Sequence, residues 1–203
     1  IFNASDEPFA DTSALPFYML SNEVKSKVKV VLSGDGGDEV FGGYRKHLGE
    51  KWSTASYLIP QFMRKIIIKL LIENKNTQYG EISRRIRRYL MNVSNDGSQR
   101  QAGWLEQINE ESITKLLGSN IEHTKNILET YRKPFKDKIN AMLAADLEFA
   151  LPGDMLVKAD RMSMANSLEV RSPFLDKELV EYAFSLPGYL KIGHFKGKKL
   201  LKD

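Results

Sequence analysis

Cysteine is absent from this chain of 203 residues, and only three histidines are present. The absence of cysteine excludes disulfides, thiolate metal ligands and cysteine nucleophiles. His47, His123 and His194 are widely separated and lack the spacing of zinc ligands, so we assign them no metal role. A chain without disulfides is compatible with a reducing cytoplasm, which is the location that we expect.

Long apolar runs are absent as well. The longest run near the middle, residues 66–72, is interrupted by Lys69 and is too short to cross a membrane, so we expect no membrane partner. The first residues contain no initiator Met, no basic segment and no apolar stretch. They are therefore not a signal peptide, and we expect the chain to be a piece of a longer protein.

The charge is mildly positive, with a net value of +4 and an isoelectric point of about 9.1. This balance favours anionic partners such as nucleotide phosphates, but it is too small to indicate nucleic acid. A basic cluster at residues 84–88 contains four arginines, and Ile82, Ile86 and Leu90 share one face of the same helical pattern. We interpret the cluster as the solvated face of a core-packed helix, and we expect no nucleic-acid partner.

One short segment has the character of a strand. Residues 28–32 are rich in β-branched side chains and end before a glycine-rich loop, so we predict a buried strand there. Apolar residues recur at helical spacing over 59–71, 81–91, 99–108, 110–117 and 121–132. Pro152 and Gly153 are predicted to break a helix, with new helices over 155–166 and 178–185. The fold is therefore predicted to be mainly α, with few strands, near 28–32.

The sharpest feature is an acidic, glycine-rich loop directly after the predicted strand. Residues 33–44 read Ser-Gly-Asp-Gly-Gly-Asp-Glu-Val-Phe-Gly-Gly-Tyr, and ligands of parallel sheets bind at the carboxyl ends of strands. Asp35, Asp38 and Glu39 bring three carboxylates into one turn. Such a turn suits a Mg²⁺ ion that bridges carboxylates and a polyphosphate, or a carboxylate that transfers protons. The alternative is an acidic helix start stabilised by the helix dipole.

Four segments resemble the asparagine synthase family. The loop itself matches the SGDGGDE-FGGY signature of that family. Residues 6–13 resemble its DEPFADxS segment, 151–165 its LPDDxLxKxDRMSMA segment and 167–176 its SLEVRxPFLD segment. The resemblance is strong over 6–44 and 144–187, whereas 51–140 are similar only in being helical.

The resemblance implies that residues 1–203 are the C-terminal part of the synthetase domain of a glutamine-hydrolysing asparagine synthase. Residues 1–50 would be the α/β portion, and 51–203 the helical portion, of an α/β adenine-nucleotide alpha-hydrolase-like (PP-loop ATP pyrophosphatase) domain. The family uses ATP and Mg²⁺ to convert aspartate into β-aspartyl-AMP, which ammonia from glutamine turns into asparagine. The implied partners are aspartate, ATP and an N-terminal glutaminase domain, and a homodimer is left open.

The resemblance also implies roles for four residues of the loop. Ser33 and Gly34 fall at positions where the family contacts the nucleotide. Asp35 falls where the family places an acid, often Glu, that takes part in forming or consuming the adenylate. Asp38 matches a magnesium-binding carboxylate.

Two cations of the third segment complete the implied site. Arg161 falls where many members carry a basic residue that meets the leaving pyrophosphate, and Lys158 lies three residues earlier on the same helical face. Both would balance the charge of the carboxylates and the polyphosphate. The alternative is that they form structural ion pairs, which is how we interpret Asp160, Glu169 and Arg171.

The chain departs from the family mainly by what it lacks. It contains no Ser-Gly-Gly-x-Asp-Ser pyrophosphatase loop and no cysteine that could serve as the glutaminase nucleophile. We therefore expect the chain to be catalytically inert on its own. The alternatives are a related amide- or lactam-forming ligase on the same scaffold and a non-catalytic helical interaction module.

Overall fold

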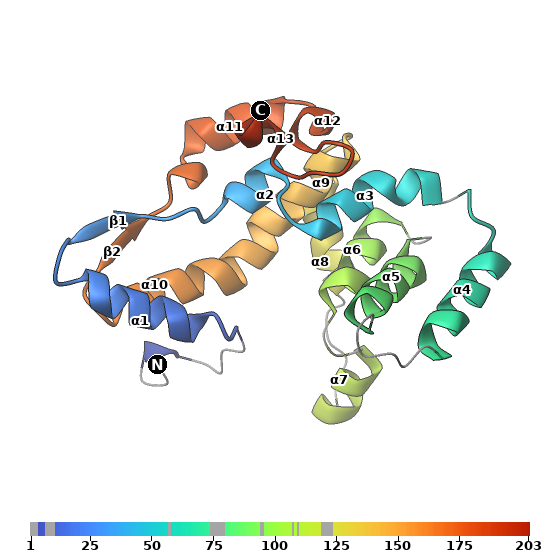
Figure 1. The fold of residues 1–203 in the computed structure, drawn as a ribbon, viewed down its shortest axis with the longest axis horizontal. Helices are drawn as coiled ribbons and strands as arrows, with labels where there is room; N and C mark the ends of the chain where they lie inside the picture. The colour runs from blue at the N-terminus through green and yellow to red at the C-terminus, as the bar shows by residue number, and fades with distance from the viewer. Residues whose placement is uncertain are drawn as a thin grey trace.

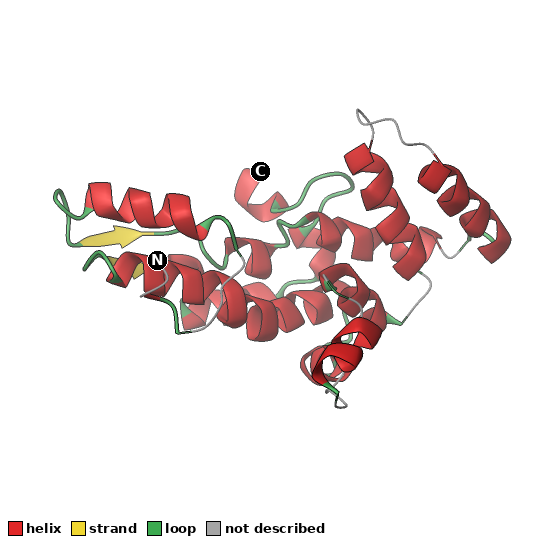
Figure 2. Cartoon of the chain, turned by 90° about the horizontal axis from the view of Figure 1, so that it is seen from below, coloured by secondary structure: helices red, strands yellow, loops and turns green. Residues whose placement is uncertain are grey.

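The computed structural model of the protein describes residues 4–6, 11–56, 58–73, 80–93, 96–106, 108, 110–118 and 124–203. Helices dominate these residues, and two short strands lie at one end of the molecule (Figure 2). The predicted mainly α fold with few strands is confirmed. No helix in this part of the chain is both long enough and apolar enough to cross a bilayer.

The end of the molecule with the two strands also holds helices α1 (Ala14–Val24) and α10 (Leu156–Met164) (Figure 1). Strand β1, Val30–Leu32, pairs in parallel with β2, Glu169–Arg171. Helices α1 and α10 pack against each other beside this pair of strands. Segments from the two ends of the chain therefore build this region together.

Strand β1 lies where the sequence predicts it, but the prediction that it is buried is wrong. Val30 is 42 % exposed and Leu32 is 73 % exposed. The reason is that the described residues give β1 a single neighbouring strand, so these side chains lack cover. The partner strand β2 was not predicted, because three residues of which two are charged carry no recognisable strand pattern.

A long helical rod connects the two ends of the molecule (Figure 1). It consists of α9 (Lys138–Ala145), a π-helix η2 (Asp146–Met155) and α10 in direct succession. The predicted break at Pro152 and Gly153 is therefore wrong. In an α-helix a proline clashes with the carbonyl four residues earlier and lacks the N–H of that turn. The wider i→i+5 turns of the π-helix use a different hydrogen-bond pattern, so the chain stays helical through Pro152.

The other end of the molecule is a cluster of helices. They are α3 (Arg45–Ser56), α4 (Gln61–Glu73), α5 (Gly80–Asn92), α6 (Gly97–Leu105), α7 (Glu110–Leu117) and α8 (Thr124–Arg132). Helix α5 carries the arginine cluster of residues 84–88. Leu90 of this helix is buried, whereas Ile82 and Ile86 are 54 % and 42 % exposed. The interpretation of α5 as core-packed thus holds only near its C-terminal end.

The short helix α2, Gly37–Phe41, carries the acidic loop into the centre of the molecule. Val40 and Phe41 are buried and pack with Ala183. The C-terminal elements run past this helix, and they are η3 (Pro173–Leu175), α11 (Lys177–Ser185), α12 (Gly188–Lys191) and α13 (Lys199–Lys202). Apolar burial of α2 therefore fixes the loop that precedes it.

Candidate functional site

The acidic loop begins at the carboxyl end of β1, where it is tied to β2. The Ser33 amide donates to the Arg171 carbonyl at 2.8 Å, and the hydroxyl oxygens of Ser33 and Ser172 lie 3.0 Å apart. Gly36 follows with φ of +86°, and a Cβ at this position would also collide with Leu175. Glycine is therefore required at Gly36 for the chain to turn from the strand into α2.

A pocket of about 370 Å³ lies next to this turn. Its walls are mostly apolar side chains of α1 and of the two strands, including Phe17, Val31 and Val170. Ser21 of α1 and the loop residues Ser33, Gly34 and Asp35 supply its polar lining. The structure thus brings together three of the residues that the sequence places in a nucleotide site.

Asp35 has an unusual carboxylate within this pocket lining. Its Oδ2 is buried and has no hydrogen-bond partner among the residues that the structure describes. A buried, unsatisfied polar atom of this kind costs about 1–3 kcal/mol, and more when it is charged. The free oxygen therefore fits a position where a cation or a hydrogen-bond donor of a ligand binds.

The three acidic side chains of the loop do not converge on one point. Asp38 Oδ1 lies 3.1 Å from the Lys198 ammonium, and Glu39 accepts a hydrogen bond of 2.6 Å from the Tyr44 hydroxyl. Burial, followed by the bond to Glu39, raises the pKa of Tyr44 above its usual range, so this hydroxyl stays a donor. Within the described ranges, no three His, Asp or Glu side chains are grouped to hold a metal ion. The described carboxylates therefore lie apart and do not form a complete set of ligands for Mg²⁺.

Lys158 and Arg161 contact acids from the start of the chain. The Lys158 ammonium lies 2.8 Å from Asp11 Oδ2 and 2.8 Å from the Ser13 hydroxyl, and Arg161 forms an ion pair with Asp6. Burial opposes ionisation of Asp11, but the hydrogen bonds from Lys158 and Ser13 outweigh it and lower its pKa to about 2. Ion pairs thus join two of the family-like segments, 6–13 and 151–165. The sequence analysis gave such pairs as the alternative for both cations, but it did not predict their partners.

The residues interpreted as structural ion pairs differ from one another. Glu169 and Arg171 form an exposed pair at 2.7 Å, as expected. Asp160 is exposed, and no ion pair of its side chain occurs among the described residues. These three residues do not line the pocket beside Ser33.

A buried polar network starts directly behind the loop, and its central histidine is a residue to which sequence reasoning assigned no role. His47 and Asp146 are fully buried, and His47 Nε2 lies 2.7 Å from Asp146 Oδ2. His47 Nδ1 accepts from the Tyr44 amide at 3.2 Å, which leaves Nε2 as the ring nitrogen that faces Asp146. Burial opposes ionisation of Asp146, but the His47 hydrogen bond and the Lys46 ammonium at 2.7 Å hold its pKa below the usual range.

The network continues into the helical end through Gln101. This side chain donates to Asp146 Oδ1 at 2.9 Å and accepts from Arg132 at 2.6 Å. The carboxylate of Glu50, which is fully buried, then joins Arg132 at 3.0 Å and Arg100 at 2.7 and 2.8 Å. Several of these polar side chains lie at helical spacing among apolar residues, and this pattern is a signal that the sequence contains. Their partners are distant in the chain, so the sequence does not reveal the network.

Known proteins are similar in sequence to nearly all of this chain. The family model described as asparagine synthase matches residues 1–203. The chain is 33 % identical to the glutamine-hydrolyzing asparagine synthetase 1 of Bacillus subtilis, covering 97 % of this chain and 31 % of that protein. It is also 33 % identical to a putative glutamine-hydrolyzing asparagine synthetase of Mycobacterium tuberculosis strain H37Rv, covering 97 % and 30 %. The protein called amidase chry2 of Gibberella zeae is 26 % identical, covering 93 % and 30 %.

The chain therefore belongs to the asparagine synthase family, and the resemblance seen in its sequence motifs is confirmed. It spans about a third of the length of the curated relatives described above. No solved structure matches it significantly.

Proposed function

We propose that this chain is part of an ATP-dependent amidoligase that converts aspartate to asparagine through β-aspartyl-AMP, with ammonia released from glutamine. The observation that carries this proposal is the pocket at the end of β1, which is lined by Ser33, Gly34 and Asp35. The buried Oδ2 of Asp35 has no hydrogen-bond partner among the described residues. Membership of the asparagine synthase family supports the proposal. The location that we propose for the enzyme is the cytoplasm.

The pocket suits a nucleotide in two respects. Its apolar walls offer a surface for a nucleoside, and Ser33 and Gly34 offer backbone and hydroxyl groups at the strand end. No atom lies within 4 Å of the position that a Cβ of Gly34 would take, so a ligand can approach the backbone closely. Asp35 lines the same pocket, where we assign it to the formation or consumption of the adenylate.

Asp38 is the residue that would hold Mg²⁺. When bound, the ion supplies positive charge that neutralises the phosphates of ATP. Asp38 is partly exposed and paired with Lys198, so its carboxylate is accessible for exchange with another cation. Because the described carboxylates form no cage, the remaining ligands would be phosphate oxygens and water, as is usual for Mg²⁺.

Arg161 and Lys158 differ in how readily they could contact pyrophosphate. The side chain of Arg161 is 43 % exposed and pairs with a largely exposed Asp6. Exposed ion pairs contribute only about 0–1 kcal/mol, so an anionic ligand can displace this one. Lys158 is buried between two partners and is better suited to hold charge in place. We therefore assign pyrophosphate departure to Arg161 and a milder, neutralising role to Lys158.

We further propose that residues 1–203 are the C-terminal part of the synthetase domain. In that arrangement, 1–50 contribute the α/β portion and 51–203 the helical portion. The glutaminase domain and a Ser-Gly-Gly-x-Asp-Ser loop, neither of which this sequence contains, would be supplied from elsewhere in the enzyme. The chain alone is then inactive.

A direct assay tests the proposal. Aspartate, ammonia and Mg²⁺-ATP should give AMP and asparagine with the full-length enzyme and no AMP above background with the isolated chain. Steady AMP release by the isolated chain would mean that the chain contains a complete ATP site and that the ATP site has been misplaced here. A second candidate is a related amide-forming ligase, which the likeness to proteins called amidases favours. Full-length enzyme that ignores aspartate but turns over with another carboxylic acid would establish it.

A further inference from the structure

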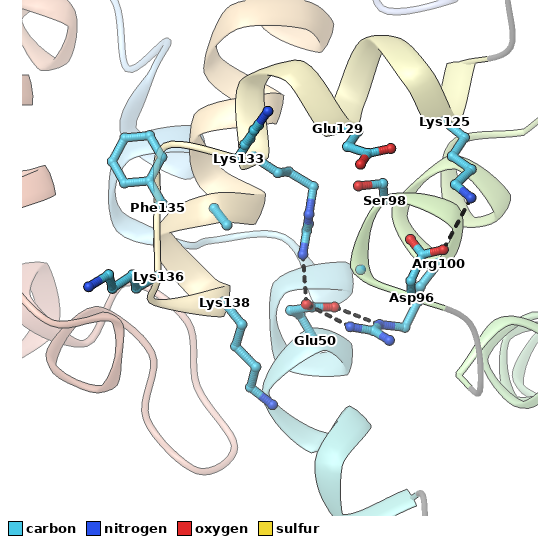
Figure 3. Close-up of a pocket in the computed structure, with 13 residues that line it drawn as sticks. Glu50, Asp96, Ser98, Arg100, Lys125, Glu129, Lys133, Phe135, Lys136 and Lys138 are labelled. Atoms are coloured by element: carbon cyan, nitrogen blue, oxygen red, sulfur yellow. Dashed lines mark hydrogen bonds and ion pairs between the residues drawn. The ribbon is translucent and has the colours of Figure 1, made fainter.

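A second pocket, of about 610 Å³, lies in the helical end of the molecule (Figure 3). It is lined by α3, α6, α8, α9 and the connection between α8 and α9. It shares no lining residue with the pocket beside the acidic loop. Six of its side chains are cationic, and they are Arg100, Lys125, Arg132, Lys133, Lys136 and Lys138. Three are anionic, so the lining carries an excess of three positive charges.

Two of the three lining acids are already engaged by cations. Glu50 accepts hydrogen bonds from Arg100 and Arg132 with both carboxylate oxygens. Asp96 caps α6 through the Gln99 amide at 2.9 Å and lies 3.3 Å from Lys125. The third acid, Glu129, is exposed on α8. The lining acids therefore leave most of the lysine charge uncompensated.

Two lysines of the α8–α9 connection and the first lysine of α9 form no ion pair with the residues that the structure describes. Lys133 and Lys136 are exposed, and neither side chain makes an ion pair or hydrogen bond within the part of the chain that the structure describes. The Lys138 ammonium meets only uncharged acceptors, with the Thr54 hydroxyl nearest at 2.6 Å. Burial lowers the pKa of Lys138, and the nearby Arg100 acts in the same direction, whereas the carboxylates of Glu50 and Asp137 oppose the shift. Lys138 is thus a partly buried cation without an ion pair among the described residues.

The opposite side of the opening adds further positive potential. Figure 3 shows Lys125 and Asp96 on this side, facing the α8–α9 connection. The start of α6 lines the pocket with Gly97 and with Ser98, a buried residue whose hydroxyl makes no hydrogen bond to any described residue. A Cβ at Gly97 would collide with the guanidinium of Arg132, so that cation lies against the positive end of a helix. The carboxylate of Glu50 compensates Arg132, and the side chain of Asp96 caps this helix end, so the pocket lies beside charges that are already paired.

We propose that this pocket binds a small phosphate-class anion with several negative charges, such as a polyphosphate chain or the phosphates of a nucleotide. Lysine ammonium groups act as point charges that contact phosphate oxygens from many directions, which suits several lysines around one opening. The exposed Lys133 and Lys136 can reorient toward the anion at little cost. The Ser98 hydroxyl offers a further donor. This inference is independent of the function proposed for the acidic loop.

Calorimetric titration of the isolated chain with sodium tripolyphosphate, in EDTA and at low salt, tests the proposal. EDTA removes the divalent ions on which the site at the acidic loop would depend. Binding should be observed and should weaken as salt is added, because exposed charges are screened. Combined Lys133→Ala and Lys136→Ala substitutions should reduce the affinity by about tenfold or more, since two charge-assisted contacts are lost. Lys138→Ala, measured separately, should also weaken binding.

Control variants and anions distinguish a specific phosphate site from general attraction between charges. Lys177 is 86 % exposed on α11 and pairs only weakly with Glu181 at 3.9 Å, so Lys177→Ala should leave the affinity unchanged. An equal loss in Lys177→Ala would show nonspecific attraction and overturn the proposal, as would the absence of binding by wild type. Citrate that binds as tightly as tripolyphosphate would overturn the assignment to phosphate. Comparison of phosphate, pyrophosphate and ATP then identifies the source of the phosphoryl groups.

Discussion

The ammonium group of Lys198 lies 3.1 Å from Oδ1 of Asp38, so a cation of the chain already contacts the carboxylate that we assign to Mg²⁺. A Cβ at Gly43 would overlap the Asp38 carboxylate and crowd Lys198, which explains why glycine stands there. Lys198 itself adopts a left-handed conformation with φ of +55°. The C-terminal segment therefore closes over the acidic loop at this point, and a metal ion at Asp38 has to compete with Lys198.

The first prediction concerns this competition. Lys198→Ala should strengthen Mg²⁺ binding by about two- to fivefold, because a partly exposed ion pair contributes only about 0.5–1 kcal/mol. Titration calorimetry of the isolated chain with Mg²⁺ measures the change. Lys199→Ala, at an exposed neighbouring position, is the matched control. Weaker Mg²⁺ binding in Lys198→Ala alone would mean that Lys198 supports the metal site instead of competing for it.

The second prediction concerns the loop carboxylates in the full-length enzyme. Asp38→Asn should abolish adenylation while glutamine hydrolysis continues, because the change removes the charge that would bind Mg²⁺ and keeps the shape. Asp35→Asn should also suppress asparagine formation. Exchange of ¹⁸O between positions of the α-phosphate of ATP isolates the adenylation step. Normal exchange in Asp38→Asn would rule out its metal role.

Asp35→Asn also allows a separate measurement on the isolated chain. The substitution removes a charge whose Oδ2 is buried without a hydrogen-bond partner in the described part of the molecule. The free energy of unfolding should therefore stay the same or rise, although activity of the full-length enzyme falls. Urea denaturation checks this expectation. A clear loss of stability would show that the Asp35 carboxylate is structural.

The third prediction separates Arg161 from Lys158 in the full-length enzyme. Arg161→Ala should raise the barrier to pyrophosphate departure by about 3 kcal/mol, the size expected for one electrostatic stabiliser. Lys158→Ala should have a smaller effect on this step and a larger one on stability, because its ammonium is held by Asp11 and Ser13. The ¹⁸O exchange rate and circular dichroism report these two effects. Unchanged exchange in a folded Arg161→Ala variant would return Arg161 to a purely structural role.

The sequence predicted local structure and motifs better than it predicted contacts. The helical periodicity of 59–71 and 110–117 matches α4 and α7, because amphipathic spacing is a local property. β2 was missed because a three-residue strand is defined by its partner rather than by its own pattern. Helix continuity through Pro152 was missed because a π-helix has no simple sequence signature.

In the candidate site, too, the sequence predicted which neighbouring residues lie together, but it did not predict contacts between residues far apart in the chain. The loop residues Ser33, Gly34 and Asp35 line one pocket, as adjacent residues in a turn can be expected to do. The partners of Asp38 and Lys158 could not be predicted, since Lys198 and Asp11 lie far away in the chain. His47 was left without a role because its partner, Asp146, is 99 residues away.

The fourth prediction concerns the buried charge cluster of the helical end. Glu50→Gln should destabilise the chain by about 3–5 kcal/mol, because it leaves Arg100 and Arg132 buried without their carboxylate. Glu111→Gln is the matched control, since Glu111 forms an exposed pair with Lys115. The control should change stability by about 0.5 kcal/mol or less. Urea denaturation of both variants measures the difference, and equal midpoints would show that the cluster contributes little.

The fifth prediction concerns acid stability. The pKa of Asp11 is about 2 in the folded chain, compared with 3.8 for an unperturbed aspartate. Since the folded value is the lower one, the stabilisation is present above pH 4 and is lost as the pH falls toward 2. A shift of this size corresponds to at most about 2 kcal/mol, and solvent screening of this partly exposed pair reduces the value. The unfolding free energy, measured with urea at several pH values, should therefore fall less steeply between pH 4 and 2 in Asp11→Asn than in wild type.

Asp160→Asn, at an exposed position without an ion pair among the described residues, should keep the wild-type slope. An identical slope in Asp11→Asn and wild type would show that the contact with Lys158 does not hold Asp11 ionised.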